Sequence, residues 1–351
     1  MTPRLPFELI ECILDSVEIA ESYDDHDRTS FLRSASLNAE WRSIARLRLY
    51  RNVVLPTPTS AAAFILLLKA DPEIAPCVLT LRLGIASGIG SEASEGKWRI
   101  ATLLKALPNV EQLFVSGLRS VELRDLGHGK GSSKLQLHCS RKLTKFHTGL
   151  RSMHLHSSTI LNSTSTLLRS LKFPFLSFLS LRHTNLASPV ASLLLRPSTL
   201  PVLRSLVLQY GSARRSVVDG FRQIAPQLEA LSLDISPDDP IQCLVALCPK
   251  LSIFDGIPTT NSLRFPLKVL RLNRKTGRNL LVKSEISEVV IAALGLDGVL
   301  ERLIVPHSWS DVDEETEDLK ALLFGRDIEI TYESAAEAEG ERKLFDTGFQ
   351  E

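Results

Sequence analysis

The phrase LRSMHL at residues 150–155 returns as LSFLSL at 176–181, LRSLVL at 203–208 and LEALSL at 228–233. A fifth copy, LSIFDG, begins at residue 251 and keeps part of the pattern. Successive copies start 26, 27, 25 and 23 residues apart. Each copy ends in two apolar residues separated by one other residue. Because side chains alternate between the two faces of a strand, these two residues share a face. The pattern therefore predicts a series of short strands with one common buried face.

The spacing of these copies is typical of leucine-rich repeats, in which each unit supplies one strand and one return segment. A single unit cannot bury its apolar face, whereas stacked units bury a continuous core. The return segments at 187–195, 215–225 and 239–248 are predicted to be helices. In the second of them, Val218, Phe221, Ile224 and Ala225 recur at three- and four-residue steps, which places them on one inward stripe.

Less regular copies extend the series in both directions. VLTLRL (78–83) and VEQLFV (110–115) lie upstream, LKVLRL (267–272) and LERLIV (300–305) lie downstream, and GRDIEITY (325–332) reads as a last strand. We therefore expect an α/β fold in which a leucine-rich-repeat solenoid, or horseshoe, of about nine short parallel strands spans residues 78–332. Solenoids of this kind usually present an extended surface for binding.

The first 55 residues do not repeat and are expected to form a separate domain of three helices. Pro6 is suited to a helix start, and Leu9, Ile10 and Ile13 then fall on one helical face. A domain of this size has a thin core, so an apolar face left over for a partner is expected. Residues 56–77, which include the run AAAFILLL at 61–68, are expected to form a buried linker helix.

The string LPFELIECIL at 5–14, followed by LNAEWRSIARLRLYRNVVL at 37–55, resembles an F-box. Together with the repeats, it makes the chain similar to the F-box proteins with leucine-rich repeats, including their large fungal families. Two features differ from the usual F-box pattern: Asn38 stands where a cysteine is common, and the loop after the first helix is longer and more acidic. The resemblance implies that this domain binds the Skp-type adaptor of a cullin–RING (SCF-type) ubiquitin ligase. The residues implied in adaptor binding are Leu5, Pro6, Leu9, Ile10, Ile13, Leu14, Leu32, Leu37, Trp41 and Leu49.

The same resemblance implies that the repeats bind a target protein and that other subunits transfer ubiquitin, so the chain itself is not expected to be an enzyme. The alternative is a leucine-rich-repeat scaffold that recruits no ligase. The sequence holds no nucleophile elbow, phosphate-binding loop or zinc-protease helix, and GIASGIG (84–90) lacks the lysine of a Walker loop. His154 and His156 have no paired-cysteine knuckle beside them. We therefore expect neither a metal nor a cofactor.

Charge is distributed unevenly along a chain whose net charge is only +1. Residues 127–218 contain thirteen Lys and Arg and no carboxylate, whereas residues 311–351 contain fourteen acids and four bases. The basic stretch favours an acidic or phosphorylated partner segment, or is ordinary solvated surface. Nucleic acid is not expected, because stacking aromatics are not interleaved with the basic residues. Residues 333–351 are expected to be an acidic, flexible tail.

The cysteines and the apolar runs favour an intracellular protein, located in the cytoplasm, the nucleus or both. Five scattered cysteines are predicted to be reduced thiols. No secretory segment opens the sequence, and the longest apolar run, of eight residues, is too short to cross a bilayer. We therefore expect no membrane association.

Residues between and beside the inward leucines should point to the opposite, concave face of the strands. They are Arg82, Gln112, Phe114, Ser152, His154, His156, Phe178, Ser180, Arg182, Ser205, Val207, Gln209, Ser232, Asp234 and Arg271. Arginines and aromatic residues dominate many interfaces, so the predicted substrate-binding residues are Arg82, Phe114, His154, His156, Phe178, Arg182, Gln209 and Arg271. For each of them an ordinary surface position is the alternative, and Phe114 and Phe178 would be core residues if the register shifted by one.

Overall fold

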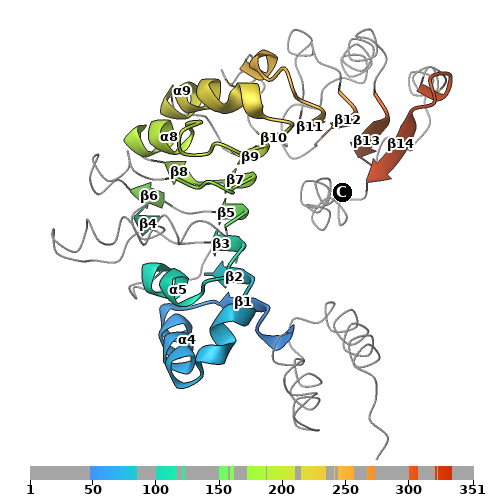
Figure 1. The fold of residues 1–351 in the computed structure, drawn as a ribbon. Coiled ribbons are helices and arrows are strands. Elements are labelled where there is room, and N and C mark those ends of the chain that lie inside the picture. The colour runs from blue at the N-terminus through green and yellow to red at the C-terminus, as the bar shows by residue number, and fades with distance from the viewer. Residues whose placement is uncertain are drawn as a thin grey trace, which may run out of the picture. The chain divides into compact units, whose positions relative to one another are not determined.

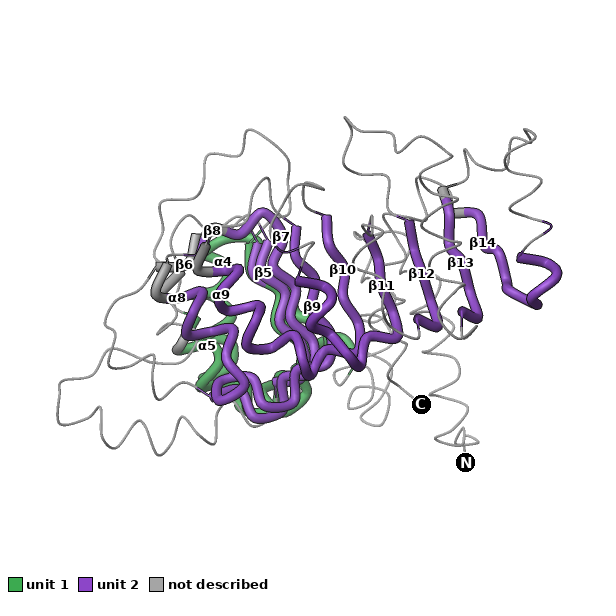
Figure 2. The backbone as a smooth tube through the Cα atoms, turned by 90° about the horizontal axis from the view of Figure 1, so that it is seen from above, with its two compact units in different colours: residues 1–114 green, residues 115–351 purple. Residues whose placement is uncertain are grey.

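The computed structural model of the chain describes residues 48–84, 100–116, 121–122, 150–156, 159–161, 172–186, 188–209, 215–234, 241, 244–256, 267–272, 300–306, 321 and 323–333. The chain divides into two compact units, residues 1–114 and residues 115–351, which Figure 2 colours separately. The boundary falls inside strand β3, and the units are described in turn.

In unit 1, the strands follow sheet order β1 (Asn52–Leu55), β2 (Thr80–Leu83) and β3 (Gln112–Ser116). Strands β1 and β2 are parallel, with Val53 opposite Leu81 and Leu55 opposite Leu83. All four of these side chains are buried. Alternation along each strand thus places the apolar residues on one face, as the sequence phrase predicts for β2.

The helices of unit 1 bury one side each. Helix α4 (Pro58–Ala70) starts at a capping box, in which Ser60 N donates to Thr57 Oγ1 and Thr57 N donates to Ser60 Oγ, both at 3.1 Å. Its residues Ala61, Phe64, Ile65 and Leu68 are buried, and it contacts β1 and α5 (Ile100–Ala106). The predicted linker helix is therefore the return helix of the first strand, and a 3₁₀ helix, η1 (Pro72–Cys77), follows it.

Unit 2 contains eight strands of the main sheet among its described residues (Figure 1). In sheet order they are β5 (Ser152–His156), β7 (Phe178–Arg182), β9 (Ser205–Gln209), β10 (Ala230–Asp234), β11 (Ile253–Asp255), β12 (Val269–Arg271), β13 (Arg302–Pro306) and β14 (Glu329–Glu333). Each adjacent pair is parallel. The register aligns the buried residues Met153, Leu179, Leu206, Leu231, Phe254, Leu270 and Leu303 in one row across the strands from β5 to β13.

Helices α8 (Ser188–Leu194) and α9 (Arg215–Ile224) lie on one side of the strands of unit 2 (Figures 1 and 2). Val218, Phe221, Ile224 and Ala225 are buried, which confirms the predicted inward stripe. Short 3₁₀ helices follow at η2 (Ala225–Gln227) and η3 (Val245–Leu247), and the latter lies within the third predicted return helix. The two longer helices contact each other at Gly220, where an added Cβ would lie 2.8 Å from Leu195 Cβ.

A second, three-stranded parallel sheet in unit 2 has the order β4 (Val121–Glu122), β6 (Thr159–Leu161) and β8 (Asn185–Leu186). The turn from β7 into β8 passes through His183, whose φ of 49° is in the left-handed region. The hydroxyl of the next residue, Thr184, donates to the Leu155 carbonyl at 2.8 Å and is buried. This bond ties the turn to the neighbouring strand β5.

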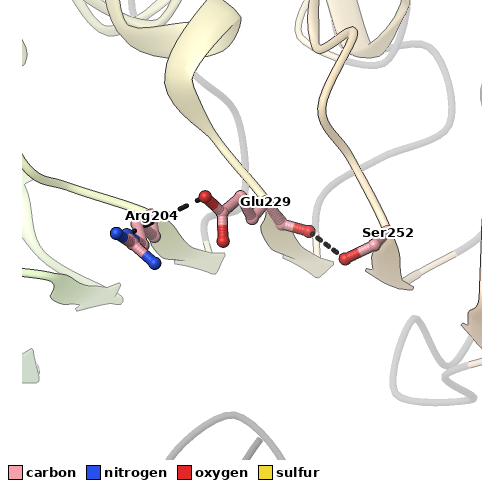
Figure 3. A network of polar contacts seen from close by, with 3 residues as sticks. All are labelled: Arg204, Glu229 and Ser252. Atoms are coloured by element: carbon pink, nitrogen blue, oxygen red, sulfur yellow. Dashed lines mark hydrogen bonds and ion pairs between the residues drawn. The ribbon is translucent and has the colours of Figure 1, made fainter. Parts of the chain in front are cut away.

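Residues just before β9, β10 and β11 make polar contacts with one another, as Figure 3 shows. Arg204 Nε lies 3.8 Å from Glu229 Oε1, and Ser252 Oγ donates to the Glu229 carbonyl at 3.1 Å. Farther along, Lys268 pairs with Glu301 at 3.1 Å. These exposed contacts each join two neighbouring repeats.

The structure confirms an α/β fold with a parallel sheet, an arrangement compatible with a repeat solenoid. Across both units the described part of the main sheet has eleven strands, not about nine. Ten of these strands lie in the segments that the sequence identified, and the eleventh, β1, was omitted because Asn52–Leu55 was assigned to the helical domain 1–55. The prediction also omitted the small sheet β4-β6-β8. The three predicted F-box helices lie outside the described residues, apart from the last residues of the motif.

Candidate binding surface

The face of the strands opposite α8 and α9 is the face predicted to be concave, and we call it the helix-distal face. In unit 2 its residues form three rows across the strands. The first row is Ser152, Phe178, Ser205, Ala230, Ile253 and Val269, and the middle row is His154, Ser180, Val207, Ser232, Asp255 and Arg271. The terminal row consists of the last residues of β5, β7, β9 and β10, namely His156, Arg182, Gln209 and Asp234.

Much of the first and middle rows is closed to solvent. Phe178, Val207 and Ala230 form a buried apolar cluster, with Ile253 packed against it. Ser180 and Ser205 are each 2% exposed. Since the neighbouring strands are only about 4.8 Å apart, small side chains in these rows are shielded by larger ones beside them. This part of the face can therefore offer little area to a partner.

A buried polar group lies in the middle row on β10, β11 and β12. Ser232 Oγ donates to Asp255 Oδ2 at 2.7 Å, and Arg271 Nη1 lies 3.9 Å from the same oxygen. Asp255 is 4% exposed and Arg271 is 7% exposed. Burial of a charge is costly unless it is paired, so this group is best explained as part of the fold.

The terminal row differs from the other two, because all four of its side chains are half-buried and thus accessible. His156 Nδ1 lies 3.2 Å from Ser116 Oγ, and Gln209 Nε2 donates to Asp234 Oδ2 at 2.6 Å. The row carries basic side chains at β5 and β7 and a carboxylate at β10. It is the polar, accessible strip of the helix-distal face in unit 2.

Histidines gather next to the basic end of the terminal row. The exposed ring of His183 lies 5.9 Å from that of His156 in an edge arrangement, and His183 N donates to the Gln209 carbonyl at 2.7 Å. In the middle row, His154 Nε2 lies 2.8 Å from Ser152 Oγ, and its ring is 4.8 Å from that of Phe178. Hydrogen bonds and ring contacts therefore fix the imidazoles of His154 and His156 on β5 and that of His183 just after β7.

On unit 1, the strands β2 and β3 carry a cation–π pair. The Arg82 guanidinium lies 4.8 Å above the centre of the Phe114 ring, with Arg82 exposed and Phe114 half-buried. Thr80 Oγ1 donates to Gln112 Oε1 at 3.4 Å on the same two strands. Such an exposed aromatic–arginine pair is typical of a protein-binding surface.

The structure thus places the eight predicted substrate-binding residues in two different environments. Arg82, Phe114, His154, His156, Arg182 and Gln209 are exposed or half-buried on their strands. Phe178 and Arg271 are buried, the first in the apolar cluster and the second beside Asp255, so neither is an open anchor. The prediction omitted His183, which lies just beyond the copy at 176–181. It also omitted Asp255, which lies in the fifth copy, LSIFDG. No local sequence pattern indicated His183, because its position follows from a turn with positive φ.

The predicted adaptor-binding residues lie outside the described residues, except for Leu49, which is helical and half-buried. Among the described residues, no group of three or more His, Cys, Asp or Glu could hold a metal ion. Within the same ranges, no helix has the length and apolar character needed to span a membrane. Comparison of the chain with protein-family models and with curated proteins finds no match.

Proposed function

We propose that this protein is the substrate-recognition subunit of a cullin–RING ubiquitin ligase of the SCF type. In this assignment, residues 1–55 bind a Skp-type adaptor as an F-box, and the repeats bind a target protein. The observation that carries the proposal is that two features occur in one chain. The first is the motif LPFELIECIL (5–14) with the segment at 37–55, and the second is a parallel sheet of leucine-bearing strands. Either feature alone is common to many functions, whereas the combination is specific to one kind of receptor.

The helix-distal face supports a binding role for the repeats. In unit 2 it carries accessible histidine, arginine and glutamine side chains on the three consecutive strands β5, β7 and β9, namely His156, Arg182 and Gln209. Rigid parallel strands hold these side chains in place, so little conformational entropy is lost when a partner binds. Transfer of ubiquitin is assigned to other subunits, with the receptor holding the target near them. Such a complex operates in the cytoplasm or the nucleus.

The test is co-purification of the full chain with a Skp-type adaptor, comparing the wild type with Leu9→Asp. A charge in the middle of the apolar motif should abolish the complex, because an aspartate cannot enter an apolar interface without a large desolvation cost. The matched control is Leu66→Asp, since Leu66 is 64% exposed on α4 and lies outside the motif. We expect this control to bind like the wild type.

Two results would contradict the proposal. A folded wild-type chain that binds no adaptor would favour the scaffold that recruits no ligase. Equal binding by Leu9→Asp and wild type would mean that the motif is not the contact. Circular dichroism of each variant separates a lost contact from a lost fold.

A further inference from the structure

The terminal row carries one cationic side chain, Arg182, and one carboxylate, Asp234, two steps apart across four adjacent strands. His156, Arg182, Gln209 and Asp234 are in register, one residue on each of β5, β7, β9 and β10. All four are half-buried, so a partner can reach them without displacing the buried rows. His183 lies beside the Arg182 end of the row, with its ring 5.9 Å from that of His156.

We infer that the terminal row binds an extended segment carrying a Glu or Asp and a Lys or Arg four residues apart. The inference rests on the proposed function for the existence of a target, and it names the chemistry of that target. The acidic residue binds at Arg182 with His156 and His183 beside it, and the basic residue binds at Asp234.

The separation follows from the geometry of a parallel sheet. Neighbouring strands lie about 4.8 Å apart, so β7 and β10, two steps apart, are separated by about 10 Å. From β5 to β10, three steps, the separation is about 14 Å. An extended segment lying across the strands advances about 3.3 Å per residue and turns alternate side chains toward the sheet, so two residues four apart, about 13 Å, face the row together and match these separations.

The side chains are suited to these two roles. The Arg182 guanidinium offers several N–H donors in a planar fork that matches a carboxylate. At the other end, Gln209 Nε2 donates to Asp234 Oδ2 at 2.6 Å, which orients the carboxylate. The second oxygen, Oδ1, is then positioned to accept a hydrogen bond from an ammonium or guanidinium group.

Opposite charges at the two ends also reject unsuitable segments. A segment with acids at both positions would bring a carboxylate against Asp234, and one with bases at both positions would bring a cation against Arg182. Repulsion of this kind is a general source of specificity at interfaces. The terminal row therefore selects a segment with both signs of charge at the right separation.

The experiment measures the Kd of the full chain for glycine–serine peptides that contain one glutamate and one arginine. The two residues are separated by one, three, four or eight positions, in both orders, and binding is followed by ligand-observed NMR. We expect the peptide with a separation of four, in one order, to bind about fivefold tighter than the others, the value of one additional partly exposed ion pair. A Kd that does not depend on separation would overturn the inference.

Charge exchange provides the second arm. Asp234→Lys should weaken the best Glu/Arg peptide and strengthen a Glu/Glu peptide of the same separation, whereas Arg182→Glu should strengthen an Arg/Arg peptide. The matched controls are Asp219→Lys and Arg222→Glu on α9, on the other side of the strands, where these two residues pair at 3.8 Å. Equal shifts in the controls, or no exchange of preference, would overturn the inference.

The same preparations are tested for adaptor binding, which separates the two proposals. Adaptor binding without any dependence on peptide separation contradicts the inference and leaves the receptor assignment standing. Dependence on separation without adaptor binding supports the inference and contradicts the receptor assignment.

Discussion

Asp255 and Arg271 occupy matching positions on strands β11 and β12, with Arg271 Nη1 3.9 Å from Asp255 Oδ2 and both side chains less than a tenth exposed. Ser232, on the next strand, donates to the same carboxylate oxygen. Three consecutive repeats are thus joined by one buried polar group inside the helix-distal face. If one charge is removed, the other remains buried without its partner.

We therefore expect Asp255→Ala to lower the free energy of unfolding by about 3–5 kcal/mol, measured by urea denaturation. Asp219→Ala is the control, because Asp219 is exposed on α9 and its ion pair with Arg222 spans only the helix surface. The control should change stability by less than about 0.5 kcal/mol. A loss below about 1 kcal/mol in Asp255→Ala would show that the group does not hold the repeats together.

A second prediction concerns the row of leucines that defines the repeats. Leu206 is fully buried in the middle of unit 2. Leu206→Ala should cost about 2–5 kcal/mol, because apolar contact is lost and a cavity remains. Val202→Ala, at a position that is 41% exposed, should cost less than about 0.5 kcal/mol. Similar losses at both positions would contradict the assignment of Leu206 to the core.

A third prediction concerns the contact between α8 and α9. Replacement of a helical glycine by alanine usually stabilises a protein by up to about 1 kcal/mol. At Gly220, however, the new Cβ would lie 2.8 Å from Leu195 Cβ and 3.1 Å from the Ala191 carbonyl oxygen. Gly220→Ala should therefore destabilise the protein by about 1–3 kcal/mol and lower the melting temperature. A higher melting temperature would show that the helices can separate at no cost.

A fourth prediction concerns thiol reactivity. Burial raises the pKa of Cys248 from 9.0 to about 12, because desolvation disfavours the thiolate. At pH 8 only about one Cys248 in ten thousand is then ionised, and the thiolate is the reactive form. Iodoacetamide should therefore modify Cys77, which is half-buried, well before Cys248 in the folded chain. Mass spectrometry of the alkylated peptides measures both, and urea should remove the difference.

Parallel strands were predictable from sequence wherever the chain repeats its full phrase. In LRSLVL, Leu206 and Leu208 alternate with Val207, and this period of two dictates a strand with one buried face. Strand β1 was missed because NVVL has no leading leucine and follows a segment that reads as helical. Strands β4 and β8 have two residues each, which is too short for any periodic signal.

The candidate surface was less predictable, because its accessibility depends on neighbours that are distant in sequence. Phe178 and Arg182 lie on the same strand and face, yet Phe178 packs against Val207 and Ala230 while Arg182 stays half-exposed. The sequence shows which face of its strand each residue takes. It does not show which positions on that face are covered by side chains from neighbouring strands. The proximity of His183 to His156 follows from a turn with positive φ, which no local pattern indicated.

The polar contacts of Figure 3 have a mechanical consequence. Arg204 pairs with Glu229, and Lys268 pairs with Glu301, in each case across a single repeat boundary. Among the described residues, each strand of unit 2 likewise pairs along the sheet with its immediate neighbours. When the chain is pulled from β14, its strands should therefore detach one after another. The force–extension trace should then show a series of small ruptures instead of one large event.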